Sequence, residues 1–210
     1  FIGPNTFIPL LEDSALIIPL GRWIINTAAK ACNRWITSIP DFVMHINLSF
    51  VQIVKSNIVK DVLENIERYS AANNHYVFEI TETIEMDQIP AVQNVFKEFV
   101  KNDFRFAIDD FGTGYSNYGY MRDRTFDIVK VDRSFVTDID KLKDNYLMVS
   151  FIIKMAHEMG LHVCIEGVET KEELSCVKKL GADYIQGYYY GKPVCLQDFE
   201  EQHLKRFVLG

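Results

Sequence analysis

Polar side chains, most of them carboxylates, stand at the carboxyl ends of a series of short apolar segments. They are Asn47, Glu79, Asp109, Asp110, Lys130, Asp132, Glu166, Glu169 and Gln186. Strand ends that meet water are often polar, but a carboxylate set beside apolar core residues needs a partner or a metal ion. The carboxyl ends of parallel strands are also where α/β proteins build their sites. We therefore interpret these residues as a candidate active site.

The types of these side chains favour hard metal ions. Oxygen donors dominate the set and neither cysteine nor histidine belongs to it, which favours Mg²⁺ or Mn²⁺ over structural zinc. Asp109 and Asp110 are adjacent and could bridge two ions. A two-metal site can activate water and stabilise the leaving oxygen of a phosphodiester. Lys130 could neutralise charge on phosphate or on a metal-bound hydroxide.

The two-residue repeat of a strand indicates which side chains share a face. Lys130 and Asp132 point the same way, and His45 lies one layer beneath Asn47. His45 could orient a ligand, but we expect a hydrogen-bonded histidine of the core. The other histidines show no ligand spacing, and we interpret them as structural or surface residues.

The segment FGTGYSNYGY, which follows the two aspartates, resembles a phosphate-binding loop. Gly112 and Gly114 would permit a tight turn. The segment nevertheless fails the pattern G-x-G-x-x-G, because Asn117 occupies the third glycine position. The chain also lacks a Walker A lysine motif and a G-x-S-x-G elbow, so a dinucleotide site, a P-loop and a serine hydrolase lose support.

Apolar periodicity predicts alternating strands and helices. The predicted strands are residues 42–47, 76–80, 104–109, 126–131, 162–166 and 183–186. The predicted helices cover about residues 14–37, 50–70, 88–102, 134–159, 170–181 and 196–208. Asp87 and Thr170 suit helix N-caps, the latter in a capping box with Glu173. Gly160 and Gly181 suit helix ends.

This alternation predicts a parallel sheet with right-handed crossovers, either open and doubly wound or closed into a (β/α) barrel. A TIM-type barrel has eight strands in about 250 residues, and six strands are predicted here. If the fold is a barrel, about two strands and about 40 residues are missing from the front.

Composition excludes several other classes of protein. The 210 residues carry a formal charge of −7, which argues against binding DNA or RNA polymers through a basic face. The apolar runs are too short to cross a membrane, and the N-terminus has no signal-peptide features. Four cysteines lie far apart, which favours free thiols in a reducing compartment and hence the cytoplasm. No linker interrupts the chain, so we expect one continuous domain.

Seven segments resemble the EAL domain family, the bacterial cyclic di-GMP phosphodiesterases. DDFGTGYSN at 109–117 is similar to the DDFGTGYSS loop of that family. The others are FIPLLEDSALI (7–17), HINLS (45–49), EITET (79–83), DIVKVDRSF (127–135), EGVET (166–170) and QGYYYGKP (186–193). They follow in the family's order and span nearly all of residues 1–210.

The resemblance implies an α/β fold, a TIM-like (β/α)8 barrel, and hydrolysis of cyclic di-GMP to linear pGpG with two Mg²⁺ or Mn²⁺ ions. It implies that Asn47, Glu79 and Asp109 bind the first metal ion, and that Asp109, Asp110 and Glu166 bind the second. Lys130 and Asp132 would position the catalytic water, and Glu166 is also a candidate general base. Glu169, Gln186 and Asp110 match further catalytic and substrate-binding positions. Glu82 would hold the loop that contains Gly112, Thr113 and Gly114 and would couple it to a dimer interface.

The Glu-Ala-Leu motif that gives the family its name does not occur in this chain. Its glutamate binds a metal ion and would precede the FIP segment, in the part that the strand count also suggests is missing. Smaller departures are Ala15, Asn117 and Gly191, none of which removes a catalytic group. We therefore expect a phosphodiesterase, inactive alone if that glutamate is lacking. The alternatives are an inactive EAL domain that senses cyclic di-GMP or binds a protein, and an unrelated two-metal hydrolase.

The resemblance also implies partners other than the substrate. EAL domains commonly form homodimers, so a homodimer is expected. The parent protein could carry GGDEF or sensor domains, and it could be membrane-anchored although this segment is not expected to contact a membrane.

Overall fold

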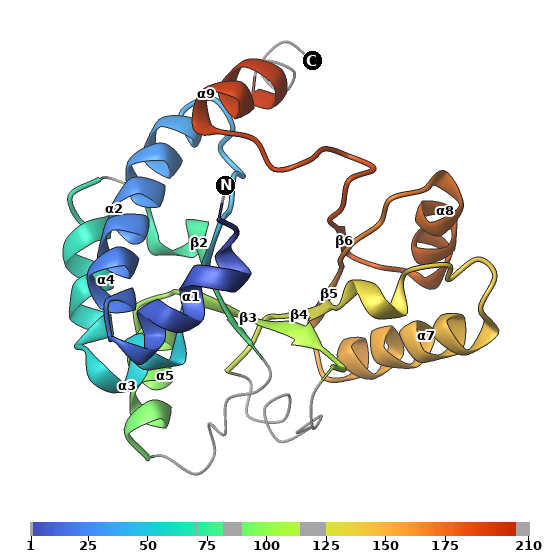
Figure 1. Ribbon diagram of the computed structural model, residues 1–210, viewed down its shortest axis with the longest axis horizontal. Helices are drawn as coiled ribbons and strands as arrows, with labels where there is room; N and C mark the ends of the chain where they lie inside the picture. Colours follow the sequence, from blue (N-terminus) through green and yellow to red (C-terminus); the bar gives the residue numbers. More distant parts are fainter. Residues whose placement is uncertain (1, 70, 82–89, 114–124, 205–210) are drawn as a thin grey trace. The chain divides into compact units, whose positions relative to one another are not determined.

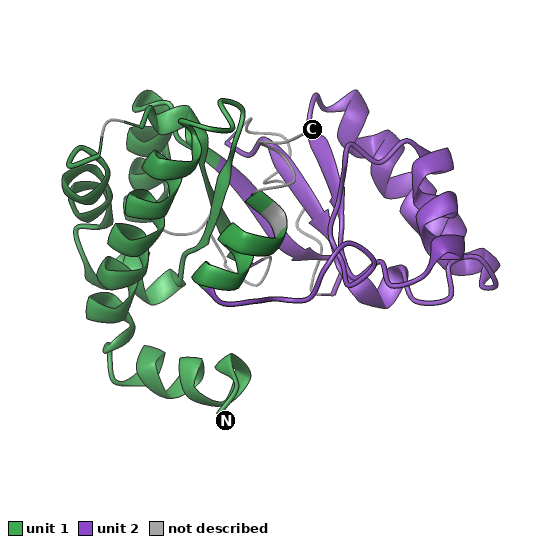
Figure 2. Ribbon diagram, turned by 90° about the horizontal axis from the view of Figure 1, so that it is seen from above, with its two compact units in different colours: residues 1–80, 85–105, 196–210 green, residues 81–84, 106–195 purple. Residues whose placement is uncertain are grey.

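The computed structural model describes residues 2–69, 71–81, 90–113 and 125–204. The chain divides into two compact units, which are described separately (Figure 2). Unit 1 comprises residues 1–80, 85–105 and 196–210, and unit 2 comprises residues 81–84 and 106–195. In the described part of the chain, no helix is both long enough and apolar enough to cross a membrane.

Unit 1 builds a parallel strand pair covered by helices (Figure 1). Its strands are β1 (Met44–Asn47) and β2 (Tyr76–Thr81), and its helices are α1 (Pro4–Asp13), α2 (Ile17–Trp35), α3 (Phe50–Lys55), α4 (Ile58–Ile66), η1 (Asn73–His75), α5 (Pro90–Lys101), α9 (Leu196–Phe199) and η4 (Glu200–Leu204). Helix α2 packs against both α4 and β1. Phe78, Phe99 and Phe104 meet in edge-to-face and tilted contacts, which are favourable between aromatic rings, and form the core beneath β2.

The last described residues return to α2. Trp35 packs its ring against Phe42 and Phe199 and donates its indole N–H to Glu200 Oε1 over 2.9 Å. Leu204 is buried in the same cluster. Unit 1 is therefore closed by contacts between segments far apart in the sequence.

Unit 2 contains a parallel sheet whose strands lie in the order β3-β4-β5-β6. These strands are β3 (Arg105–Phe111), β4 (Ile128–Val131), β5 (His162–Ile165) and β6 (Tyr184–Ile185), and the helices are η3 (Arg133–Phe135), α7 (Lys143–Glu158) and α8 (Lys171–Leu180). Helix α7 packs against β5 and α8. Strand β4 is buried along its whole length, as expected for a strand covered on both faces.

All six predicted strand segments contain a strand. The helix predictions needed three corrections. Residues 4–13 form α1, which was not predicted; Pro4 stands at the first helical position, where its missing N–H is not needed. The predicted helix 50–70 is two helices, because Ser56 is extended and Asn57 caps a new helix by accepting from Lys60 N–H. The predicted helix 134–159 begins only at Lys143, after η3 and a turn with positive φ at Asp138.

The predicted caps that fall in the described residues are confirmed. Thr170 and Glu173 form a capping box, and Gly160 and Gly181 have φ of 80° and 87° at helix ends. Asp87 lies outside the described residues.

Glu173 does more than complete the capping box. Its Oε2 accepts from the backbone N–H groups of Glu169 and Thr170 over 2.9 and 3.0 Å, and its Oε1 accepts from Asp138 N–H over 3.2 Å. Burial raises the pKa of this carboxyl, but the hydrogen bonds outweigh it and hold the pKa below the ordinary value of 4.5. The side chain is 6% exposed, so it fixes the segment between β5 and α8 from inside.

We expect Glu173→Gln to destabilise the protein by about 1–3 kcal/mol at pH 7, because an amide cannot serve three N–H donors as a carboxylate does. A carboxylate whose pKa is lowered by folding stabilises the protein above its unfolded pKa and loses that effect as pH falls through the folded pKa. The difference from the unmodified chain should therefore shrink below about pH 4.5. Urea unfolding at several pH values measures it.

The matched control is Glu172→Gln, which removes an exposed glutamate from the same helical turn. Equal effects of the two substitutions at pH 7 would contradict the role given to Glu173.

Candidate functional site

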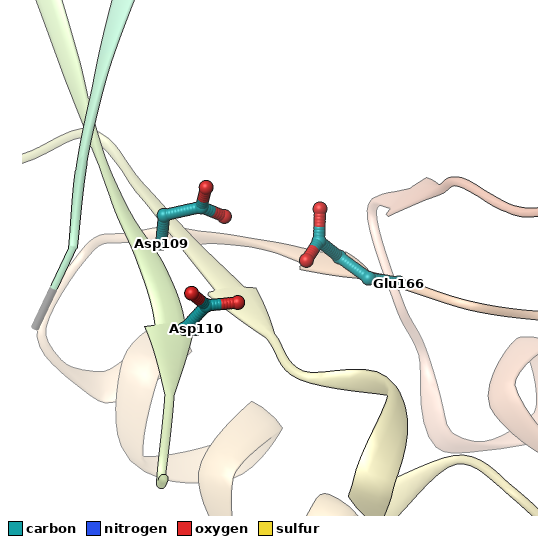
Figure 3. A group of neighbouring side chains, drawn as sticks. All are labelled: Asp109, Asp110 and Glu166. Carbon is teal, nitrogen blue, oxygen red and sulfur yellow. The ribbon is translucent and has the colours of Figure 1, made fainter. Parts of the chain in front are cut away.

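The two adjacent aspartates lie at a bulge in β3. Ile108 pairs with Val129 and Phe111 pairs with Val131, so three residue steps on β3 face two on β4. Asp110 lies within this bulge and has a φ of 54°, in the left-handed region, which accommodates the extra residue. Consecutive side chains of a regular strand point to opposite faces of the sheet, and a bulge changes the direction in which a side chain points. Figure 3 shows the result, with the carboxylates of Asp109 and Asp110 both directed toward Glu166.

Asp109, Asp110 and Glu166 form one acidic cluster, called here the carboxylate cluster. One oxygen from each lies within 4.8 Å of the others. Glu166 reaches it from the residue directly after β5, and its N–H donates to Val131 O over 3.1 Å, which continues the sheet pairing by one residue. The predicted metal ligands of unit 2 are therefore brought together.

Lys130 lies between the carboxylates of the cluster. Its strand, β4, has β3 on one side and β5 on the other, and its Nζ lies 2.8 Å from Asp109 Oδ1 and 2.8 Å from Glu166 Oε1. The lysine is only 3% exposed, so its charge is supported by these two partners. Three carboxylates around one ammonium leave an excess of negative charge. The cluster thus suits a divalent cation in both donor type and charge.

Two glycines allow the loops after β3 and β5 to approach the segment after β4. Gly112 has φ of 97°, and a Cβ there would lie 2.7 Å from Phe135 Cε2. Gly167 has φ of 70°, and a Cβ there would lie 2.3 Å from Arg133 Cβ. Thr113 closes the first loop by donating its hydroxyl to Asp110 O over 2.8 Å. Larger side chains at either glycine would push these loops away from the cluster.

The other predicted residues of unit 2 that the structure describes lie in the segments after β4, β5 and β6. Asp132 Oδ1 accepts from Ser134 N–H over 2.9 Å and so begins η3. Glu169 is exposed, and Gln186 is exposed after β6, where its N–H donates to Ile165 O. Glu82 and Gly114 lie outside the described residues.

Asn47 and Glu79 are the predicted ligands of unit 1. They are directly opposite each other in the register of β1 and β2. Glu79 is buried, with 6% exposed, whereas Asn47 is exposed. Ile46 and Leu48 alternate with Asn47 and are buried, so the polar residues of β1 share the other face, as strand parity predicts.

His45 is hydrogen-bonded as expected, but the expectation that it lies in the core is wrong. Its side chain is 37% exposed, and its Nδ1 lies 2.7 Å from Glu79 Oε1. Strand parity identified the face on which His45 lies, but it could not identify a partner on another strand, because that depends on the register between β1 and β2. The contact between His45 and Glu79 was therefore not predicted from the sequence.

We expect Lys130→Met to cost about 3 kcal/mol of stability when divalent cations are chelated, because it leaves the partly buried carboxylates of Asp109 and Glu166 without their cation. Urea unfolding in EDTA measures this cost. The matched control is Lys141→Met, which removes a lysine that pairs with Asp138 over 2.6 Å at an exposed site. That substitution should cause little change, because exposed ion pairs contribute little. Similar losses for both variants would show that the buried pairing is not important.

Known proteins resemble this chain over nearly its whole length. The family model described as "EAL domain" matches residues 1–193. PdeL of Escherichia coli, named a cyclic di-GMP phosphodiesterase, is 32% identical over 196 residues, which are 92% of this chain and 54% of that protein. The first curated relatives are much longer, since the chain spans between 23% and 39% of their length.

Solved structures show the same fold. The MucR phosphodiesterase of Pseudomonas aeruginosa, in complex with c-di-GMP, matches with a TM-score of 0.88 and 29% identity, over 94% of this chain and 81% of that one. The EAL domain of Mycobacterium smegmatis DcpA matches with a TM-score of 0.83 and 29% identity, over 90% and 86%. The fold is therefore the α/β, TIM-like barrel type of these domains, and the chain belongs to the EAL domain family.

Proposed function

We propose that this chain is a metal-dependent phosphodiesterase that hydrolyses cyclic di-GMP to linear pGpG. The observation that carries the proposal is the carboxylate cluster of Asp109, Asp110 and Glu166, joined by buried Lys130, in a member of the EAL family. Relatives named cyclic di-GMP phosphodiesterases, and a related structure in complex with c-di-GMP, support the substrate.

The metal ions are Mg²⁺ or Mn²⁺ in this proposal, since every donor is a carboxylate or amide oxygen. Asn47, Glu79 and Asp109 would hold one ion, and Asp109, Asp110 and Glu166 the other. Bound there, the ions would supply an activated water and stabilise the charge of the leaving oxygen.

The chain's own residues would then have separate tasks. Glu169 is a further catalytic residue, and Lys130 balances the charge of the cluster and, together with Asp132, positions the attacking water. Glu166 receives its proton as that water bonds to phosphorus and the bond from phosphorus to a ribose oxygen breaks. Gln186 and Asp110 hold the substrate. The product is the linear dinucleotide, and the ribose oxygen that leaves takes up a proton.

The proposal extends to assembly and location. Glu82, Gly112, Thr113 and Gly114 couple the loop after β3 to a homodimer interface. The segment works in the cytoplasm as one EAL domain, and a longer parent protein could carry GGDEF or sensor domains and could be membrane-anchored.

Hydrolysis should be abolished by chelation and by loss of a metal ligand. We expect purified protein to convert cyclic di-GMP to pGpG with Mg²⁺ or Mn²⁺, and EDTA to stop the reaction. Glu79→Gln should lower turnover by more than about 100-fold, beyond the cost of losing a residue that only orients a ligand. Chromatography of the nucleotides measures both.

The control for Glu79→Gln is Glu64→Gln, which changes an exposed glutamate of α4 in the same unit. Cyclic di-GMP binding measured by calorimetry separates the outcomes when turnover is absent. Binding without turnover would show a sensor instead of an enzyme, and absence of both would overturn the proposal.

A further inference from the structure

His45 contacts a predicted metal ligand without belonging to the ligand set. Its Nδ1 lies 2.7 Å from Glu79 Oε1 across the β1–β2 pair. In the register of the two strands, Asn47 is opposite Glu79 and His45 is opposite Val77. The imidazole therefore reaches forward by one strand repeat to meet the carboxylate.

The direction of this hydrogen bond follows from its partner. An ionised carboxylate can only accept, so the Nδ1–H of His45 donates to Oε1. A glutamate side chain has several rotatable bonds, and an oriented donor restricts the positions that its carboxylate can take. Since Glu79 is 6% exposed, water contributes little to holding it.

We propose that His45 is a positioning residue for Glu79: it fixes the carboxylate in the orientation that binds the metal ion. This inference rests on the proposed function, in which Glu79 is a metal ligand. Residues that hydrogen-bond metal ligands orient them, and their loss typically weakens metal binding by about 10- to 100-fold. The role requires a donor at the position of Nδ1 and no other property of imidazole.

That requirement predicts which substitutions are tolerated. Asparagine places its amide nitrogen near the position of Nδ1 and can still donate to Glu79 Oε1. Alanine removes the donor. His45→Asn should therefore retain most of the affinity for Mn²⁺, whereas His45→Ala should weaken it by about 10-fold.

The experiment is a Mn²⁺ titration of the chain without substrate, in which electron paramagnetic resonance measures free Mn²⁺. The matched control is His75→Ala, which removes a histidine of the same unit whose Nδ1 contacts Phe42 O at 2.8 Å. That variant should bind Mn²⁺ as the unmodified chain does. Thermal unfolding of each variant shows whether it is folded.

Glu79→Gln in the same titration separates this inference from the proposed function. Weak binding by Glu79→Gln together with full binding by His45→Ala would overturn the role of His45 alone. Unchanged binding by Glu79→Gln, or none by the unmodified chain, would overturn the metal site and the inference with it. An equal loss of Mn²⁺ affinity in His45→Asn and His45→Ala would show that Mn²⁺ binding does not depend on a hydrogen-bond donor at this position.

A second measurement does not depend on any variant. Nitrogen-15 correlation spectra of the imidazole rings distinguish the two neutral tautomers, and donation to Glu79 requires the Nδ1–H form for His45. Finding the Nε2–H form in the neutral ring would contradict the hydrogen bond and therefore the inference.

Discussion

A buried ammonium group between two carboxylates is the interaction on which the candidate site depends. Lys130 Nζ lies 2.8 Å from an oxygen of Asp109 and 2.8 Å from an oxygen of Glu166. A lysine that is 3% exposed can remain charged only with such partners, and the partners must come from the strands on either side of β4. The parallel order of the sheet, which ends all these strands at one edge, is therefore what makes the cluster possible.

The backbone near this cluster departs from regular strand geometry. A regular β3 would turn Asp109 and Asp110 to opposite faces, and the bulge with positive φ at Asp110 brings them together. Gly112 and Gly167 accept positive φ and leave no room for a Cβ, so the adjoining loops pack closely on the segment after β4. Local strain of this kind persists only where the surrounding contacts hold it.

The buried carboxylate of unit 1 contacts an imidazole. Glu79 Oε1 lies 2.7 Å from Nδ1 of His45. An ammonium group that pairs with a carboxylate competes with a cation for the same oxygens, whereas an N–H donor orients a carboxylate at a smaller electrostatic cost to metal binding. The two groups of predicted ligands thus differ in the described contacts of their carboxylates.

From the sequence alone, apolar periodicity located all six strands of the described residues, and the polar residues near their carboxyl ends predicted that Asp109, Asp110, Glu166 and Lys130 lie together. These features are local, because a strand pattern and the residue at its end lie within a few positions of each other. The break between α3 and α4 at Ser56 and the late start of α7 were not predicted, since turns inside polar stretches leave the periodicity nearly unchanged. The bulge at Asp110, the three hydrogen bonds accepted by Glu173 and the contact of His45 with Glu79 were decided only by the tertiary structure. Each depends on which residues of distant segments stand opposite one another, and that register is set by packing, not by the neighbouring sequence.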